Sequence, residues 1–374
     1  MKKILKAFFK KVVFGGIFPL AYRWNARKPI KEKSVLFIEI RYDKLTNNFA
    51  LLWDSLSSKD GVSVELICLG NSIYPYKTYL KKCFLMLRKL ALAEYVIVDE
   101  SSNVLAALPI RKESKMIQVW HGCGAFKRFG HGIEGGLEER YYNPYHLVTV
   151  SSPEVVDIYA QSMHQDKNIV EPIGVSRTDV FFSNAYIENS MRSIREKYNI
   201  PQDKKIVLYA PTFRGNVQNA VAPRMLDISK LYDALSDTYV ILYKGHPSVR
   251  TTLSIDEKHK AFFFDVGKDS IEVLMCAADC CITDYSSLVF EYALLERPMY
   301  FFAYDYKEYV NDRGFYYDYE TFVPGPICYH EEELVKHINS QVDINKVIEF
   351  KKRFMSACDG NATTRIIERM FSET

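Results

Sequence analysis

The sequence predicts an α/β protein with two consecutive doubly wound units that face each other across a cleft. Three observations predict this fold class. Short apolar runs alternate with amphipathic stretches along most of the 374 residues, a pattern typical of parallel sheets covered by helices on both faces. The alternation breaks near Pro201 and then restarts. The chain is also long for a single core, which favours two domains.

The amino end of the chain predicts a basic amphipathic helix. Residues 1–31 carry nine basic residues and no acidic one, which leaves the rest of the chain at about −6. Apolar residues between Ile4 and Val13 recur at helical spacing, with lysines mainly beside that stripe. The longest uncharged run, Val12 to Tyr22, is too short to span a bilayer.

We therefore interpret residues 1–30 as a segment that lies on an anionic membrane surface. Two alternatives are a helix packed on its own domain and a signal peptide, although no small-residue cleavage site follows the apolar stretch. Nucleic acid is not an expected partner, because basic residues elsewhere do not cluster. The protein is expected at the cytoplasmic face of the membrane as a peripheral protein.

Six apolar runs predict the strands of a first domain, residues 31–185. They are 34–40, 62–69, 95–100, 116–120, 147–151 and 169–174, with amphipathic stretches such as 45–57 and 76–91 between them. A polar helix over about 185–199 leads to the linker around Pro201. The second domain, residues 186–374, has predicted strands at 205–211, 239–245, 262–266, 279–284 and 299–304.

The eight cysteines do not indicate a disulfide scaffold or a zinc site. None forms a CxxC pair, and no paired Cys or His spacing suits tetrahedral ligation. We expect most of them to be buried thiols in a reducing compartment, with the cytoplasm as the default. Neither a metal nor a cofactor is expected. The sequence also has no GxGxxG, Walker, GxSxG or DxD motif, so nicotinamide, P-loop and hydrolase functions lose their usual support.

Polar residues gather directly after four predicted strands. Ligands of doubly wound folds bind at the carboxyl ends of strands, so these residues are the candidate site. They are His121 after 116–120, Thr212 and Arg214 after 205–210, Lys244 and His246 after 239–244, and Asp284, Ser286, Ser287 and Glu291 after 279–283.

Each candidate also has a structural interpretation. Asp284 or Ser286 could simply cap a helix, although two adjacent hydroxyls at a helix amino end also form an anion site. Arg214 could clamp a phosphate or be a solvated surface residue. Glu291 could reach ribose hydroxyls or be a surface carboxylate. His121 could be packed in a tight turn or handle a proton.

Taken together, four segments resemble the CDP-glycerol glycerophosphotransferase family of teichoic acid synthesis. They are WHG (120–122), APTFRG (210–215), KGHP (244–247) and the long block 282–327, which is the most specific. The resemblance covers about residues 30–370. It implies a GT-B-type fold of two Rossmann-like domains. It also implies transfer of glycerol phosphate from CDP-glycerol to a hydroxyl of a polyprenyl-diphosphate-linked saccharide or growing polymer, with release of CMP.

The resemblance implies a role for each matching residue. His121 would be the general base, and His246 would bind the donor pyrophosphate and neutralise or protonate it. The phosphate site would contain Thr212, Arg214, Lys244, Ser286 and Ser287, with Asp284 beside it and Glu291 as a ribose ligand. Gly122 and Gly124 would allow close backbone approach, and Cys123 would be a small loop filler.

One segment departs from the family pattern. Relatives often have a Gly-containing loop and an Asn-Pro after the first strand, whereas this chain has EIRYDKLTNNFALL (39–52). That segment is expected to face the acceptor, so acceptor identity stays open. The alternatives to the CDP-glycerol function are a transferase for CDP-ribitol or another alditol, a glycosyltransferase for nucleotide sugars, and a non-catalytic membrane scaffold.

Overall fold

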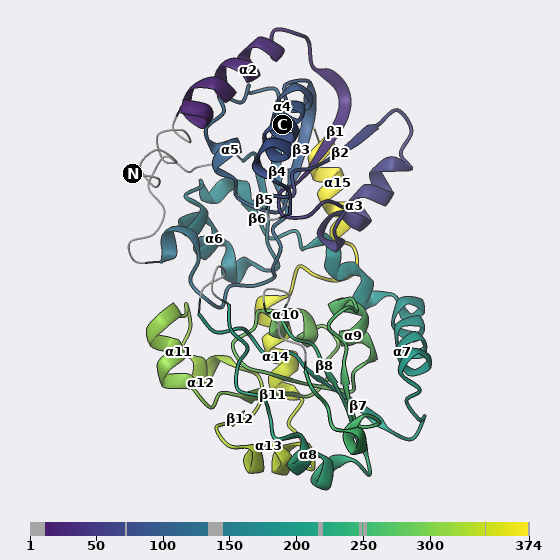
Figure 1. Ribbon diagram of the computed structural model, residues 1–374. Coiled ribbons are helices and arrows are strands. Elements are labelled where there is room, and N and C mark those ends of the chain that lie inside the picture. Colours follow the sequence, from purple (N-terminus) through teal and green to yellow (C-terminus); the bar gives the residue numbers. More distant parts are fainter. Residues whose placement is uncertain are drawn as a thin grey trace. The chain divides into compact units, whose positions relative to one another are not determined.

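The computed structural model describes residues 12–71, 73–133, 145–215, 220–246, 249, 253–340 and 342–372. Two compact units divide the chain (Figure 1). Unit 1 consists of Met1–Gly122, Phe129–Asp179 and Ala357–Thr374, and unit 2 of Cys123–Arg128 and Val180–Ser356. Of the predicted amino-terminal helix, residues 1–11 lie outside the described residues, and with them five of its lysines.

Unit 1 has a six-stranded parallel sheet in the order β2-β1-β3-β4-β5-β6. The order reverses between β1 and β3, so the polar residues that follow these two strands lie at the switch point of the sheet. The strands are β1 (Lys31–Glu39), β2 (Ser63–Cys68), β3 (Ala93–Val98), β4 (Lys115–Gln118), β5 (Leu147–Thr149) and β6 (Val170–Glu171).

Helices cover this sheet, as the nearly continuous burial of its central strands β1, β3 and β4 requires. Val35 and Phe37 of β1 share one buried cluster with Phe49 and Leu52 of α3 and Ile366 of α15, while α4 packs against β1, β2 and β3 as well. The helices are α2 (Phe18–Asn25), α3 (Asn47–Ser57), α4 (Tyr76–Leu90), α5 (Asn103–Ala106), α6 (Val156–Met163) and α15 (Ala362–Phe371). Short 3₁₀ or π turns are η1 (Val13–Ile17), η2 (Gly130–Gly132), η4 (Pro153–Val155), η5 (Lys167–Ile169) and η6 (Ser176–Phe182).

Unit 2 has a second parallel sheet, in the order β12-β11-β10-β7-β8-β9, which reverses between β7 and β10. Its strands are β7 (Lys205–Tyr209), β8 (Tyr239–Tyr243), β9 (Phe263–Asp265), β10 (Cys280–Thr283), β11 (Met299–Phe302) and β12 (Ile327–Cys328). Its helices are α7 (Asn184–Tyr198), α8 (Ile228–Leu235), η8 (Glu257–His259), α9 (Ile271–Ala277), α10 (Leu288–Ala293), α11 (Tyr306–Arg313), α12 (Tyr319–Phe322), α13 (Glu331–Ile338) and α14 (Asn345–Phe354).

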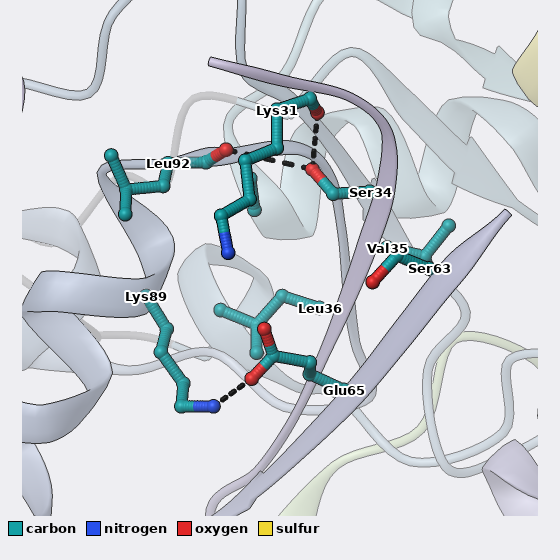
Figure 2. Close-up of a pocket in the computed structure, with 9 residues that line it drawn as sticks. Lys31, Ser34, Val35, Leu36, Ser63, Glu65, Lys89 and Leu92 are labelled. Atoms are coloured by element: carbon teal, nitrogen blue, oxygen red, sulfur yellow. Dashed lines mark hydrogen bonds and ion pairs between the residues drawn. The ribbon is translucent and has the colours of Figure 1, made fainter. Parts of the chain in front are cut away.

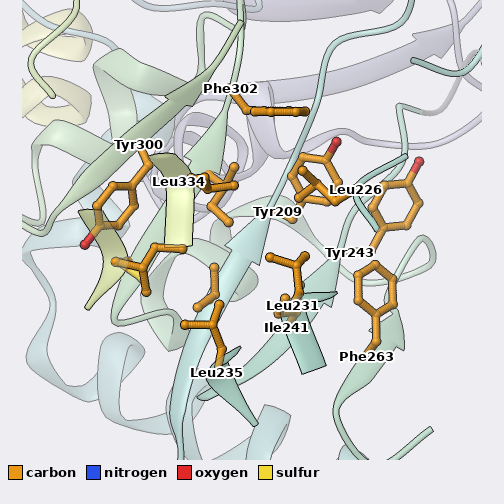
Figure 3. Close-up of a cluster of buried hydrophobic side chains, with 14 of the residues drawn as sticks. Tyr209, Leu226, Leu231, Leu235, Ile241, Tyr243, Phe263, Tyr300, Phe302 and Leu334 are labelled. Atoms are coloured by element: carbon orange, nitrogen blue, oxygen red, sulfur yellow. The ribbon is translucent and has the colours of Figure 1, made fainter. Parts of the chain in front are cut away.

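The core of unit 2 fills one face of this sheet with aromatic and aliphatic side chains (Figure 3). Tyr209 and Ile241 of the central strands pack with Leu231 and Leu235 of α8, and Leu334 of α13 completes the layer. Burial of such side chains contributes about 1.5–3 kcal/mol each. This packing makes the sheet a rigid base for the loops at its carboxyl edge.

The predicted α/β class with two doubly wound units is confirmed, and each of the eleven predicted strands coincides with an observed one. The short strand β12 has no counterpart among the predicted strands. The predicted polar helix 185–199 is α7. Among the described residues no two cysteines form a disulfide, and seven of the eight are buried, as expected.

The units differ from the predicted domains in two segments. Ala357–Thr374 belongs to unit 1, not to the second domain, because α15 buries Ile366 and Met370 against that core. Asp179 also accepts hydrogen bonds from the first amides of α15, at Ala362 and Thr363. Long-range packing of this kind leaves no local signal in the sequence.

Cys123–Arg128, directly after the WHG turn, belongs to unit 2. The ring of Phe126 stacks on Phe315 at 4.6 Å and on Phe322 at 4.8 Å. The Arg128 amide donates to the carbonyl of Gly314, and the Tyr316 amide donates to the carbonyl of Phe126. The chain therefore leaves unit 1 at Gly122, one residue after His121.

The described part of the amino-terminal segment packs on unit 1 with one face. Phe18 and Tyr22 of α2 are buried; Phe18 meets the Phe84 ring edge-on, and the Tyr22 hydroxyl accepts from the Arg111 amide. The opposite side leaves Leu20 and Trp24 65% and 68% exposed. In the part of the chain that the structure describes, no helix combines the length and the apolar character needed to span a membrane.

Gly124 needs the absence of a side chain, whereas Gly122 does not. Gly124 has φ +60°, and a Cβ there would lie 2.2 Å from the Phe290 ring, while a Cβ on Gly122 would meet no atom closer than 3.9 Å. We expect Gly124→Ala to lower the free energy of unfolding by about 2–5 kcal/mol, from left-handed strain of about 1–2 kcal/mol and overpacking of about 1–3 kcal/mol.

Thermal unfolding measures this difference, with Gly122→Ala as the matched control. The Gly124 variant should melt several degrees below the control, since each kcal/mol corresponds to about 2–4 °C in a unit of this size. Equal melting temperatures for the two variants would contradict the proposed packing.

Candidate active site

His121 lies directly beyond the carboxyl end of β4 in unit 1, and its ring is held from one side. The Nδ1 atom is 3.0 Å from the backbone oxygen of Asp99 and 3.2 Å from Oε1 of Glu100. Both neighbours are acceptors, so Nδ1 carries the proton. In the neutral ring Nε2 therefore has the lone pair, and among the described residues it has no protein partner.

The protonation state of His121 suits a base at neutral pH. Burial disfavours the charged ring and lowers the pKa of His121 to about 4, against the hydrogen bond to Asp99, which raises it. The side chain is still 35% exposed, so a substrate hydroxyl can reach it. Packing in a tight turn would account for the burial of His121. It would not account for a ring whose Nδ1 meets two acceptors while its Nε2 has no partner among the described residues.

Trp120, the residue before His121, has a strained backbone. Its φ is +54°, unusual for an aromatic residue. The Trp120 amide donates to Oε1 of Gln118 at 2.9 Å, and Nε2 of Gln118 donates to the hydroxyl of Tyr145 at 2.8 Å. The Trp120 ring lies 4.2 Å from the His121 ring. Gln118 and Tyr145 thus fix the turn that aims the imidazole.

Three carboxyl groups lie at the same end of the sheet as His121, and the sequence analysis missed all three. Glu39 ends β1, while Asp99 and Glu100 follow β3, so they lie at the switch point of the unit 1 sheet. Glu39 and Asp99 are only 1% and 3% exposed. A signal was present in the sequence, because an acidic residue ends each of two predicted buried strands.

Asp99 is the carboxyl group most affected by this crowding. Burial and the nearby charge of Glu39 raise the pKa of Asp99 to about 7. Its Oδ2 accepts from Asn48 at 2.7 Å, and Asn48 in turn accepts from Arg177 at 2.7 Å. Its buried Oδ1 has no hydrogen-bond partner among the described residues. Asp99 therefore titrates near neutral pH, and its backbone oxygen meets the His121 ring.

Unit 2 brings the other predicted residues together at its own switch point, after β7, β8 and β10. Asp284 ties these loops to one another. Its Oδ1 accepts from the amides of Thr212 and Tyr285, and its backbone oxygen accepts from the Tyr319 hydroxyl. The hydroxyl of Thr212 is buried and has no hydrogen-bond partner among the described residues.

Arg214 is paired within the protein. Its guanidinium donates to both oxygens of Asp305 and, at 2.9 Å, to Oδ2 of Asp284. The Tyr285 and Tyr309 rings lie 5.2 and 5.1 Å from its central carbon. Burial opposes its charge, but the bonds to Asp305 and Asp284 outweigh that effect and raise its pKa. Arg214 is thus neither a solvated surface residue nor an uncommitted cation.

Lys244 has a comparable role in the next loop. Its Nζ donates to the backbone oxygens of Gly267 and Asp269, both at 2.7 Å, and burial lowers its pKa. His246 stacks near Phe213, with ring centroids 4.6 Å apart. Lys244 therefore supports the loop that carries His246, and Pro247 of the same motif lies outside the described residues.

The Ser-Ser pair starts α10, but the cap differs from the predicted one. Ser287 is the N-cap, not Asp284 or Ser286, and its side chain makes no capping bond. The Ser286 hydroxyl accepts from the Leu288 amide at 3.2 Å. Glu291 is 6% exposed, so the surface-carboxylate alternative is wrong and its ribose role stays a prediction.

Comparison with known proteins decides the family. The model of the family described as CDP-Glycerol:Poly(glycerophosphate) glycerophosphotransferase matches residues 20–372. The chain belongs to this family. It is 32% identical to a teichoic acid ribitol-phosphate primase of Bacillus spizizenii over 97% of both chains. It is also 34% identical to a teichoic acid poly(ribitol-phosphate) polymerase of that species, covering 95% of this chain but 59% of the relative.

The family fold is shared with a solved structure. A histidine-to-asparagine variant of the wall teichoic acid polymerase TagF superposes with a TM-score of 0.76 and 23% identity, over 99% of this chain and 96% of that chain. This similarity supports the Rossmann-like architecture of both units. Within the described residues, no group of three or more His, Cys, Asp or Glu side chains is arranged to hold a metal ion.

A small pocket of unit 1 lies away from this family site (Figure 2). Its walls include Lys31, Ser34, Ser63 and Ala93, at or near the starts of β1, β2 and β3. Lys89 pairs with Glu65 beside it. Since ligands of such sheets bind at the carboxyl ends of strands, this pocket is not a candidate for the donor or the acceptor.

Asp99 provides a test through the pH dependence of stability. Its pKa is raised on folding, so its stabilising contribution is complete below the ordinary pKa of 3.8 and is lost as pH rises through about 7. Asp99→Asn abolishes this titration. We expect its melting temperature, relative to that of the wild type, to increase between pH 4.5 and pH 8. A difference independent of pH would show that Asp99 is ionised throughout.

Arg214 provides a second test, of the donor loops. Arg214→Lys keeps a charge but loses the forked donor geometry, and disrupting a buried pair costs about 3–5 kcal/mol. We expect the urea midpoint to fall accordingly. The matched control is Arg224→Lys, whose ion pair to Glu331 is 3.7 Å long with the arginine 55% exposed, so it should lose under about 1 kcal/mol. Equal losses would show that Arg214 is not a scaffold residue.

Proposed function

We propose that this protein transfers an alditol phosphate from a CDP-alditol to a hydroxyl of a lipid-linked acceptor in teichoic acid synthesis, with release of CMP. The observation that carries the proposal is the orientation of His121. Two acceptors hold the proton on Nδ1, so Nε2 is available to remove a proton from the acceptor hydroxyl. The acceptor oxygen then attacks the β-phosphorus of the donor, and the bond from that phosphorus to CMP breaks.

Unit 2 is the proposed donor side. The loops after β7, β8 and β10 offer the Thr212 hydroxyl, His246 and the hydroxyls of Ser286 and Ser287 to the diphosphate. The charge of Arg214 is balanced by Asp284 and Asp305, so this arginine acts mainly by positioning Thr212. The remaining counter-charge comes from Lys244 and from His246, which the donor phosphates favour in its protonated form.

The donor alditol has two candidates. CDP-glycerol is the donor implied by the family description. CDP-ribitol is favoured by the relative that covers 97% of both chains, a ribitol-phosphate primase. We therefore propose CDP-ribitol as the first donor to test and CDP-glycerol as the second. A priming activity, with few units added, is favoured by the same relative.

The membrane is a proposed partner. The exposed side chains of Leu20 and Trp24 on α2 lie among Arg23, Arg27 and Lys28, and the Arg27 guanidinium is 4.5 Å from the Trp24 ring. Exposed apolar side chains flanked by cations suit an anionic membrane surface. Peripheral attachment at the cytoplasmic face would bring the enzyme to its lipid-linked acceptor.

The test is CMP release by the purified protein with a lipid-linked acceptor and each CDP-alditol in turn. We expect turnover with one alditol donor, and a loss on the order of 10²–10⁴-fold in His121→Asn, with donor binding unchanged in a thermal-shift titration. Thr149→Ala, whose hydroxyl is buried in β5, is a control for general damage to unit 1.

Three results would contradict the proposal. Turnover by His121→Asn at the wild-type rate would show that His121 is not the general base. Stabilisation by UDP-sugars alone, with none by either CDP-alditol, would favour the glycosyltransferase alternative, and no binding of any nucleotide donor would favour the scaffold.

A further inference from the structure

One carboxylate oxygen in unit 1 is shared between the base and an arginine. Oε1 of Glu100 is 3.2 Å from Nδ1 of His121 and 2.6 Å from Nη2 of Arg41. Glu100 is 14% exposed, whereas the Arg41 side chain is 47% exposed. Glu100 is therefore the fixed member of the trio, and Arg41 is the member that solvent or a ligand can reach.

We propose that Glu100 is a positioning residue that orients His121 and stabilises its protonated ring, and that Arg41 limits this effect by holding the same oxygen. The proposal rests on the proposed function, in which His121 is the base. When Nε2 takes the proton of the acceptor hydroxyl, the ring becomes a cation whose Nδ1 still meets the Asp99 backbone oxygen and lies 3.2 Å from Oε1 of Glu100. The carboxylate then lies opposite a positive charge that was absent in the resting state.

The competition follows from electrostatics. A carboxylate this close to an imidazole favours the imidazolium, whereas a guanidinium on the same oxygen withdraws part of that attraction and repels the new cation. Arg41 and Arg177 both lower the pKa of His121. Burial raises the pKa of Glu100, whereas Arg41 lowers it. The other charged groups of this cluster are Glu39 from β1 and Asp99 after β3.

The two neighbouring carboxyl groups, Glu39 and Asp99, have other hydrogen-bond partners than His121. Glu39 is occupied by the amides of Arg41 and Tyr42 and by the Thr46 hydroxyl. The Asp99 carboxylate is held by Asn48, and only its backbone oxygen meets the imidazole. Of the three carboxylates, Glu100 is the one for which the structure records a side-chain contact to His121.

The proposal predicts shifts of opposite sign for two variants. In Arg41→Met the full charge of Glu100 acts on the ring, so the pKa of His121 should rise by about one unit or more. In Glu100→Gln the ring should stay neutral to the lowest pH at which the protein is folded. The readout is NMR titration of the histidine ring signals of labelled protein, with the His121 signal assigned by its loss in His121→Asn.

Matched controls use charges of the same kind outside the cluster. Glu65→Gln removes a carboxylate near the opposite end of the same sheet, where it pairs with Lys89. Arg192→Met removes an exposed arginine of α7 in unit 2. Neither should move the His121 titration. Shifts of the same sign in Arg41→Met and Glu100→Gln, or shifts no larger than in the controls, would overturn the proposal.

Measurements of turnover test the same proposal at the level of catalysis. Glu100→Gln should lower kcat on the order of 10–10²-fold, a part of what a general base contributes, while KM for the CDP donor stays within about twofold. Arg41→Met should move the acid limb of the kcat profile to higher pH. If His121→Asn retains turnover, His121 is not the general base, while the NMR shifts still test how Glu100 and Arg41 act on its ring. If His121→Asn is inactive and Glu100→Gln is fully active, only this inference fails.

Discussion

The chemistry of this protein depends on one local constraint, the pair of acceptors that meet Nδ1 of His121. The Asp99 carbonyl and the Glu100 carboxylate can only accept, so the ring proton has no other place in the neutral state. This requires β3 and β4 to be adjacent in the sheet, because Asp99 follows one strand and His121 the other. The strained backbone of Trp120, whose amide donates to Gln118, also fixes the position of the His121 ring.

In unit 2, ion pairs and hydrogen bonds hold the three loops after β7, β8 and β10 together at the edge of the sheet. Asp284 accepts hydrogen bonds from its own loop and from the loop after β7, and Arg214 links it to Asp305. Lys244 does the same for the loop after β8 by holding two carbonyl oxygens. Arg214 and Lys244 are thus both engaged by protein groups, and in the proposed function the hydroxyl and imidazole groups of these loops meet the phosphates.

The sequence predicted the strands, the two-unit organisation and the location of the candidate residues, because apolar runs and the residues after them are local features. It could not assign α15 to unit 1 or Phe126 to the core of unit 2, since both depend on partners far along the chain. It also missed Glu100, whose importance comes only from a 3.2 Å contact to a residue on the neighbouring strand. Arg214 was placed in the right loop, but its carboxylate partners were not foreseen.

The charges of the two units suggest how donor and acceptor are distinguished. Around His121, three carboxyl groups face two guanidinium groups, and burial keeps the pKa of Asp99 near 7. A diphosphate brought to this site would meet carboxylates that repel it, whereas a neutral hydroxyl would meet a neutral base. In unit 2 the carboxylates of Asp284 and Asp305 pair with Arg214, so in the proposed function a diphosphate would meet hydroxyl groups and His246 there. In the proposed function, the neutral ring of His121 meets the acceptor hydroxyl and the loops of the unit 2 sheet meet the nucleotide, whichever alditol is transferred.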